Sequence, residues 1–169
     1  RLQDTTSWIS QRSRRGKFAA YLDLEHPNID KFLTIKDKTS DIHEVPFAVK
    51  IGDKWIRQLK EGDKDKREIW AKIIKKKFET GFPYIMFKDN VNNNRPDIYK
   101  DLGKYVNNSN LCSEILLSND HKNTFVCCIG AMNLVHFDEW KDTDAVEVLL
   151  NLLDTFLIDF INKNESNVL

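Results

Sequence analysis

The sequence predicts an α/β fold with parallel strands. In the first half of the chain, short strand-like segments alternate with segments of helical periodicity, the order typical of βα units. The run FPYIMF, residues 82–87, is apolar at nearly every position, as expected of a strand buried on both faces of a parallel sheet. The chain has 169 residues with no internal repeat and no low-complexity linker, which favours one domain.

Local patterns define the elements expected before residue 88. Pro27 suits the first turn of a helix, and apolar side chains follow it at helical spacing. Gly62 and Gly81 are expected to end helices, because glycine readily adopts the left-handed conformation of a C-cap. The expected elements are a strand at 17–24, a helix at 26–36, a strand at 44–51, helices at 53–63 and 64–81, and the strand at 82–87.

The second half of the chain predicts a loop, two strands and a long helix. The Asn-rich segment 88–97 is expected to be a polar loop, since asparagine favours turns. Strands are expected at 110–117 and 123–134. The helix expected at 143–163 has only a thin polar stripe, which indicates that it packs on more than one neighbour.

Charge and hydropathy argue against nucleic acid and membrane as partners. Lys plus Arg and Asp plus Glu each number 26, so no net field draws the chain to a polyanion. No apolar run approaches the roughly eighteen residues that a membrane span needs, and the first residues contain no apolar core of a signal peptide. We therefore expect a cytoplasmic protein that binds neither membrane nor nucleic acid.

The cysteine count and the first residue bear on the context of the chain. Three cysteines, two of them adjacent, do not predict a disulfide framework. The Cys127–Cys128 pair also lacks the spacing of a zinc site, so no metal is expected. The sequence begins with Arg1 inside patterned sequence, and we interpret it as a piece of something longer.

One amide, one thiol and one carboxylate alternate in the segment NSNLCSEILLS, residues 108–118. In a strand, Asn110, Cys112 and Glu114 would project from one face. Burying these groups together costs several kcal/mol, about 2 to 7 for each unpaired polar group, unless something polar meets them, and a substrate is one candidate. The alternative is a small core cysteine, a carboxylate at an exposed strand end and an asparagine that caps a turn.

The segment SNLCSEI resembles the active-site strand of the class I ribonucleotide reductase large subunit, whose pattern is Asn-Leu-Cys-x-Glu-Ile. Three other segments are similar to that family and occur in its order. They are RRGKFAAYLDLEHPNIDKFL, TGFPYIMFKDNVN and TFVCCIGAMNL, and with the first motif they cover nearly the whole chain.

The resemblance implies a radical mechanism on a ribonucleotide. Cys112 would form the thiyl radical that abstracts the 3′ hydrogen, and Glu114 would be the general base for the 3′-hydroxyl proton. Asn110 would hydrogen-bond the ribose hydroxyls. Cys127 would be one half of the cysteine pair that supplies two electrons, with its partner cysteine in a segment preceding this chain. Cys128, on the opposite face of the expected strand, would be a core residue.

The resemblance also implies a fold, a domain layout and partners. The chain would be one partial catalytic domain, residues 1–169, of the ten-stranded α/β barrel of ribonucleotide reductase large subunits. Within it, residues 1–16 would be the effector and specificity loop region, in which Gln11 and either Arg14 or Arg15 would act. Residues 107–134 would form the active-site strand and the redox-cysteine strand. Residues 143–163 would form a long packing helix.

The expected partners are those of a complete reductase. No cofactor would be bound directly, since a metal-containing small subunit would supply the radical, while nucleotide effectors are possible. A ribonucleoside diphosphate substrate, the remaining segments of the large subunit and a reductant of the thioredoxin or glutaredoxin type complete the set. The isolated chain is not expected to turn over nucleotides.

Two other functions remain open from the residues alone. The chain could be a split or diverged fragment that acts as an assembly piece of a larger reductase, as the nearly all-round apolar helix suggests. It could also be an unrelated cysteine enzyme that pairs Cys112 with one of the four histidines.

Overall fold

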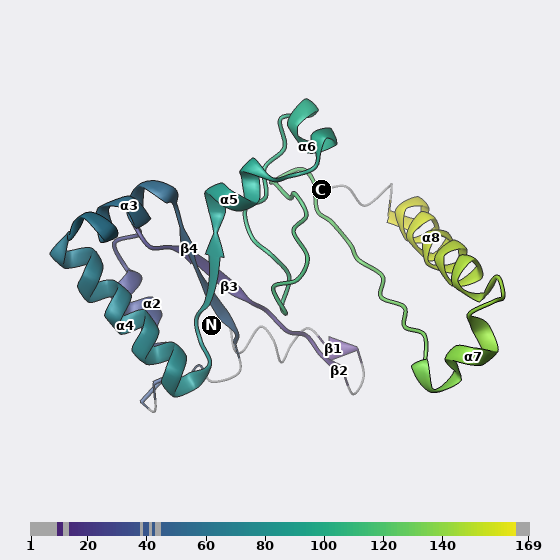
Figure 1. The fold of residues 1–169 in the computed structure, drawn as a ribbon, viewed down its shortest axis with the longest axis horizontal. Helices are drawn as coiled ribbons and strands as arrows, with labels where there is room; N and C mark the ends of the chain where they lie inside the picture. The colour runs from purple at the N-terminus through teal and green to yellow at the C-terminus, as the bar shows by residue number, and fades with distance from the viewer. Residues whose placement is uncertain (1–9, 12–13, 38, 41, 43–44, 165–169) are drawn as a thin grey trace. The chain divides into compact units, whose positions relative to one another are not determined.

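The computed structural model describes residues 10–11, 14–37, 39–40, 42 and 45–164, which form two compact units divided after Ser118. The first unit contains the sheet, and the second begins at Asn119 (Figure 1). The first unit consists of β1 (Ser10–Gln11), β2 (Arg14–Arg15), β3 (Ala20–Asp23), α2 (Ile29–Leu33), β4 (Phe47–Ile51), α3 (Asp53–Glu61), α4 (Lys64–Thr80), β5 (Tyr84–Phe87), α5 (Lys88–Asn93) and α6 (Asp97–Asp101). The second consists of η1 (Leu134–His136), α7 (Phe137–Trp140) and α8 (Ala145–Asn164).

The predicted parallel sheet is confirmed. Its strand order is β3-β4-β5, and both neighbouring pairs are parallel. Each strand is followed by helical structure, so these are the βα units that the alternating sequence pattern predicts.

The core lies on one face of this sheet. Phe47, Val49 and Ile51 alternate along β4, so they share a face, and each is almost completely buried. Helices α2, α3 and α4 cover that face (Figure 1). The buried residues that complete the cluster are Leu24, Ile29, Leu33, Trp55 and Ile73.

The ends of α3 and α4 follow from the residues that the sequence analysis singled out. Gly62 and Gly81 are the C-caps, with φ angles of 101° and 76°, in the left-handed region that glycine adopts without a Cβ clash. Asp63 begins α4 by accepting a hydrogen bond from the backbone N–H of Lys66. The two predicted helix ends are thus confirmed.

The prediction of a polar loop at 88–97 is wrong, because α5 and α6 fill most of this segment. Its asparagines support helical turns instead of opposing them. The amides of Asn92 and Asn94 donate to the carbonyl oxygens of Lys88 and Asn90, four residues earlier, at 2.8 Å in both cases.

The predictions of strands at 110–117 and 123–134 are also wrong. Neither segment forms a strand in the structure, and neither pairs with a described strand. A strand exists only where a neighbour completes its ladder of hydrogen bonds. In the second segment, Gly130 instead packs against α8, where an added Cβ would lie 3.1 Å from Leu149 and 3.2 Å from Leu153.

The predicted long helix is confirmed as α8, two residues shorter at its start than expected. Thr143 precedes it and its hydroxyl accepts a hydrogen bond from the N–H of Ala145. No helix in the described part of the chain is both long and apolar enough to cross a membrane. Many large apolar side chains of α8 are exposed: Val146, Val148, Leu150, Leu152, Phe156, Ile158, Phe160 and Ile161.

Candidate functional site

The segment that contains Cys112 lies over the face of the sheet opposite the helices. Tyr21, Ala48 and Tyr84 are in register across the three strands and point to this face, since their neighbours on β4 point to the core. A cavity of about 170 Å³ separates the two layers. Its lining combines sheet residues with Ser109, Ser113 and Leu116 of the segment.

Asn110 organises this segment into a compact turn. Its Oδ1 accepts hydrogen bonds from the backbone N–H groups of Glu114 and Ile115, both at 3.1 Å. Its backbone carbonyl accepts from the N–H of Ser113 at 3.2 Å. The hydroxyl of Ser109 closes the turn by donating to the carbonyl of Ile115 at 2.6 Å. These bonds satisfy backbone groups that a strand would have paired with a neighbour.

Tyr21 of β3 holds the turn from the sheet. Its hydroxyl donates to the carbonyl oxygen of Asn110 at 3.0 Å and lies 3.0 Å from the hydroxyl oxygen of Ser113. Ser113 has a φ of 66°, a left-handed conformation that is uncommon for a residue with a Cβ. Asn110 and Ser113, on either side of Cys112, are thereby held to a strand 89 and 92 positions earlier, and no local pattern predicts contacts over such a separation.

The structure brings the three predicted residues together by a different route from the one expected. They lie in one turn and not on one face of a strand, because the Asn110 side chain bonds the backbone of the turn. Cys112 and Glu114 are exposed. The Nδ2 group of Asn110 makes no hydrogen bond to the described residues.

The other predicted site residues lie in the second unit or in the strand pair β1–β2. Cys127, in the second unit, is exposed, and Cys128 is half-buried. Gln11, Arg14 and Arg15 belong to the antiparallel pair β1–β2, in which Gln11 lies opposite Arg14. The remainder of the predicted effector region, residues 1–9 and 12–13, lies outside the described residues.

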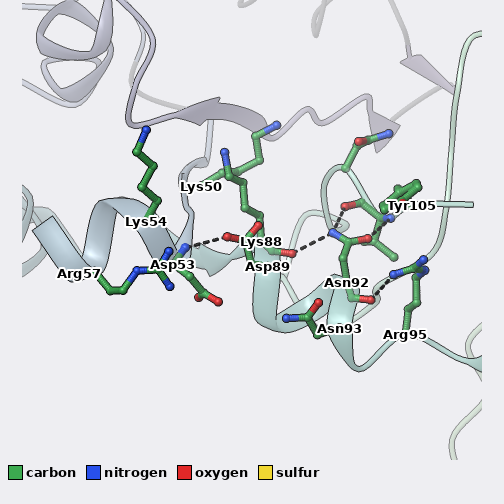
Figure 2. Close-up of a pocket in the computed structure, with 12 residues that line it drawn as sticks. Lys50, Asp53, Lys54, Arg57, Lys88, Asp89, Asn92, Asn93, Arg95 and Tyr105 are labelled. Carbon is green, nitrogen blue, oxygen red and sulfur yellow. Dashed lines mark hydrogen bonds between the residues drawn. The ribbon is translucent and has the colours of Figure 1, made fainter. Parts of the chain in front are cut away.

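A second, larger cavity of about 560 Å³ lies near the carboxyl ends of β4 and β5 (Figure 2). This is the edge of a parallel sheet at which α/β proteins commonly bind small molecules. The sequence analysis missed it, although basic residues close to two strand ends were a usable signal. Its lining is polar and basic: Lys50, Asp53, Lys54, Arg57, Lys88, Asp89, Asn92, Asn93, Arg95, Tyr105, Val106 and Asn107.

Long-range hydrogen bonds fix the walls of this basic cavity. Asp89 accepts a hydrogen bond from the backbone N–H of Asp53, the first residue of α3, at 2.7 Å. Asn92 bonds both backbone groups of Val106, accepting from its N–H at 2.9 Å and donating to its carbonyl at 3.0 Å. Helix α5 is thereby linked to α3 and to the segment that leads to the Cys112 turn.

An ion pair joins the outer strands of the sheet at the same edge. The ammonium group of Lys88, just after β5, binds the carboxylate of Asp23 at the end of β3. Partial burial opposes ionisation of Asp23, but hydrogen bonds from Lys88 and the Glu25 amide outweigh it and lower its pKa. The hydrogen bond to Asp23 likewise raises the pKa of Lys88.

Among the residues that the structure describes, no group of three or more His, Cys, Asp or Glu side chains could hold a metal ion.

A family model described as "Ribonucleotide reductase, barrel domain" matches residues 57–167. Over 95% of its length the chain is 31% identical to the "Putative ribonucleoside-diphosphate reductase large subunit" of Frog virus 3 (isolate Goorha), covering 32% of that protein. It is 26% identical to the "Ribonucleoside-diphosphate reductase subunit alpha" of Chlamydia trachomatis serovar D, covering 96% of this chain and 20% of that one.

Among solved structures, the "Actinobacillus ureae class Id ribonucleotide reductase alpha subunit" is similar to this chain, with a TM-score of 0.79 and 48% identity. The match covers 88% of this chain and 28% of that subunit. The chain thus spans less than a third of the length of each of these three relatives.

Proposed function

Because the chain belongs to the ribonucleotide reductase family, matching part of its barrel domain, we propose that it supplies the radical-bearing turn of a large subunit that reduces ribonucleoside diphosphates to deoxyribonucleotides. The observation that carries this proposal is the turn at residues 109–115, which exposes Cys112 on the sheet face opposite the helices. In an α/β barrel that face is the interior.

In this proposal the residues of the turn have separate roles. The Cys112 thiyl radical takes the 3′ hydrogen atom of the ribose, which restores the thiol and leaves a radical on the sugar. Glu114 accepts the proton of the 3′-hydroxyl group. The Nδ2 group of Asn110 donates to a ribose hydroxyl while its Oδ1 continues to hold the turn.

Loss of the 2′-hydroxyl group as water, with hydrogen taking its place on the 2′ carbon, requires two electrons and two protons. Cys127 supplies half of these electrons by forming a disulfide with a cysteine that is not among the three of this chain. A reductant of the thioredoxin or glutaredoxin type then restores the two thiols. At the end of the cycle Cys112 recovers its radical by returning a hydrogen atom to the 3′ carbon.

The radical comes from a metal-containing small subunit, and no cofactor is assigned to this chain. Gln11 and either Arg14 or Arg15 contact the base of the substrate or respond to a nucleotide effector. Replacing one of these two arginines by alanine should change the ratio of the four deoxynucleotide products, whereas an unchanged ratio in both single variants removes this role.

The test of the main proposal uses the complete large subunit with its small subunit and reductant. Cys112→Ser should abolish deoxynucleotide formation, because the serine O–H bond is too strong for the exchange. Cys127→Ser should stop turnover with the disulfide-dependent reductant, while the neighbouring Cys128→Ser retains it. Substantial activity in Cys112→Ser protein that binds the small subunit normally refutes the radical assignment.

A second candidate function is assembly alone, in which the chain docks other segments of a reductase without chemistry of its own. The exposed apolar side chains of α8 favour it, since such a helix is stable only when covered. Sedimentation of the isolated chain distinguishes the two: a monomer at all concentrations, with no binding of hydrophobic dyes, argues against an obligatory docking role.

A further inference from the structure

The basic cavity carries an excess of positive charge that nothing in the described structure neutralises. Lys50, Lys54, Arg57 and Arg95 make no ion pair with any described residue, and Lys88 is paired with Asp23. The lining also contains two carboxylates, Asp53 and Asp89. Four unpaired cations against two carboxylates leave two positive charges in one cavity, the charge that a phosphate dianion would balance.

The cations are not merely the solvated side of one helix. Lys54 and Arg57 are exposed on α3, and such residues are usually solvated. Lys50 and Arg95 are half-buried, however; Lys50 belongs to β4, and Arg95 lies in the loop after α5. The Nε atom of Arg95 is buried without a hydrogen-bond partner, and its guanidinium lies 4.5 Å from the ring centre of Tyr105. The Nη1 group of Arg95 also donates to the carbonyl oxygen of Asn92. These contacts hold the charge at the cavity wall, where an anion would balance it.

The shape of the cavity supports the same conclusion. Figure 2 shows the ammonium groups of Lys50, Lys54 and Lys88 extending to the same side. The volume of the basic cavity, about 560 Å³, lies within the range of small-molecule sites and exceeds what one phosphate group needs. The hydrogen bonds of Asp89 and Asn92 hold its walls in place before any ligand arrives.

We propose that this cavity binds a phosphate-bearing small molecule through Lys50, Lys54, Arg57 and Arg95. Arginine is suited to such a role because its fork of N–H groups meets two phosphate oxygens. Neither Cys112 nor Glu114 lines the cavity, so this site is independent of the proposed radical chemistry.

The test is a calorimetric titration of the complete large subunit with inorganic pyrophosphate at constant ionic strength. Arg57→Gln should weaken binding about tenfold, the effect of one lost charge-assisted hydrogen bond. Lys60→Gln is the matched control, because Lys60 is exposed on the same helix and does not line the cavity. Pyrophosphate should bind Lys60→Gln protein as tightly as it binds the unaltered protein.

Lysine acetylation read by mass spectrometry gives a second measurement that does not depend on activity. Saturating pyrophosphate should protect Lys50 and Lys54 from acetylation and leave Lys60 unprotected. Equal affinity for Arg57→Gln and Lys60→Gln protein, or no protection of Lys54, overturns the proposal. So does a Lys54 that is already unreactive without pyrophosphate, since another segment of the large subunit would then fill the cavity.

Discussion

Removing the hydroxyl group of Tyr21, with the substitution Tyr21→Phe, should loosen the turn that carries Cys112. The change deletes the hydrogen bond to the carbonyl of Asn110 and the 3.0 Å contact with the Ser113 hydroxyl. The aromatic ring stays, so the lining of the cavity beneath the turn is preserved. The N–H of Ser113 still bonds the Asn110 carbonyl, which is therefore not left without a donor.

The size of the effect follows from these contacts. Each neutral hydrogen bond contributes about 0.5–1.5 kcal/mol net to stability. The loss of one or both should therefore destabilise the turn by about 1–2 kcal/mol. If the turn opens independently of the sheet, its open population rises roughly tenfold, because about 1.4 kcal/mol corresponds to a factor of ten. The global stability should change by less, since the core face is untouched.

Hydrogen exchange of the backbone amides measures this opening directly. In Tyr21→Phe protein, the amides of Ser113, Glu114 and Ile115 should exchange about tenfold faster, because all three are bonded to Asn110. The amides of β4 should keep their rates. Deoxynucleotide formation by the complete large subunit should fall as well, because in the proposed function the same turn positions both the radical at Cys112 and, through Asn110, the ribose.

Tyr99→Phe is the matched control. The Tyr99 hydroxyl accepts a hydrogen bond from the N–H of Ser118 at 3.3 Å, at the far end of the same segment. This variant should leave the rates at residues 113–115 unchanged. The reasoning is refuted if Tyr21→Phe leaves them unchanged too, or if exchange rises equally throughout the sheet, because Tyr21 would then stabilise only the fold.

Two further predictions concern stability. Lys88→Met should destabilise the protein by about 1 kcal/mol or less through loss of the pair with Asp23. The pKa of Asp23 is lowered and that of Lys88 is raised, so the pair stabilises the fold while both groups are charged. Denaturant unfolding should therefore show the difference in unfolding free energy between the two proteins at neutral pH, and this difference should shrink below about pH 4 and above about pH 10. A difference that does not depend on pH contradicts the ion-pair explanation. Gly130→Ala should cost about 1 kcal/mol because its Cβ would crowd Leu149 and Leu153, and Leu149→Ala in the same protein should relieve the crowding. Additive losses in the double variant would show that the contact does not exist.

The sequence by itself determined the elements whose signals are local. The unbroken apolar run before Phe87, the glycines at 62 and 81, and the apolar periodicity of α8 specify conformation through neighbouring residues, so the strand and the two helix ends could be predicted. The motif around Cys112 identified the family in the same way, because a motif is recognised from its residue types and their spacing alone. The residues that contact it in the fold need not be known.

Tertiary structure alone decided how the functional groups are held. Asn110 forms a turn and not a strand because its backbone neighbours have no ladder partner, and Tyr21 is 89 positions away from it. The basic cavity likewise depends on hydrogen bonds of Asp89 and Asn92 across 36 and 14 positions. Hydrogen-bond partners so distant in the chain are chosen by the packing of the sheet, which no local pattern encodes.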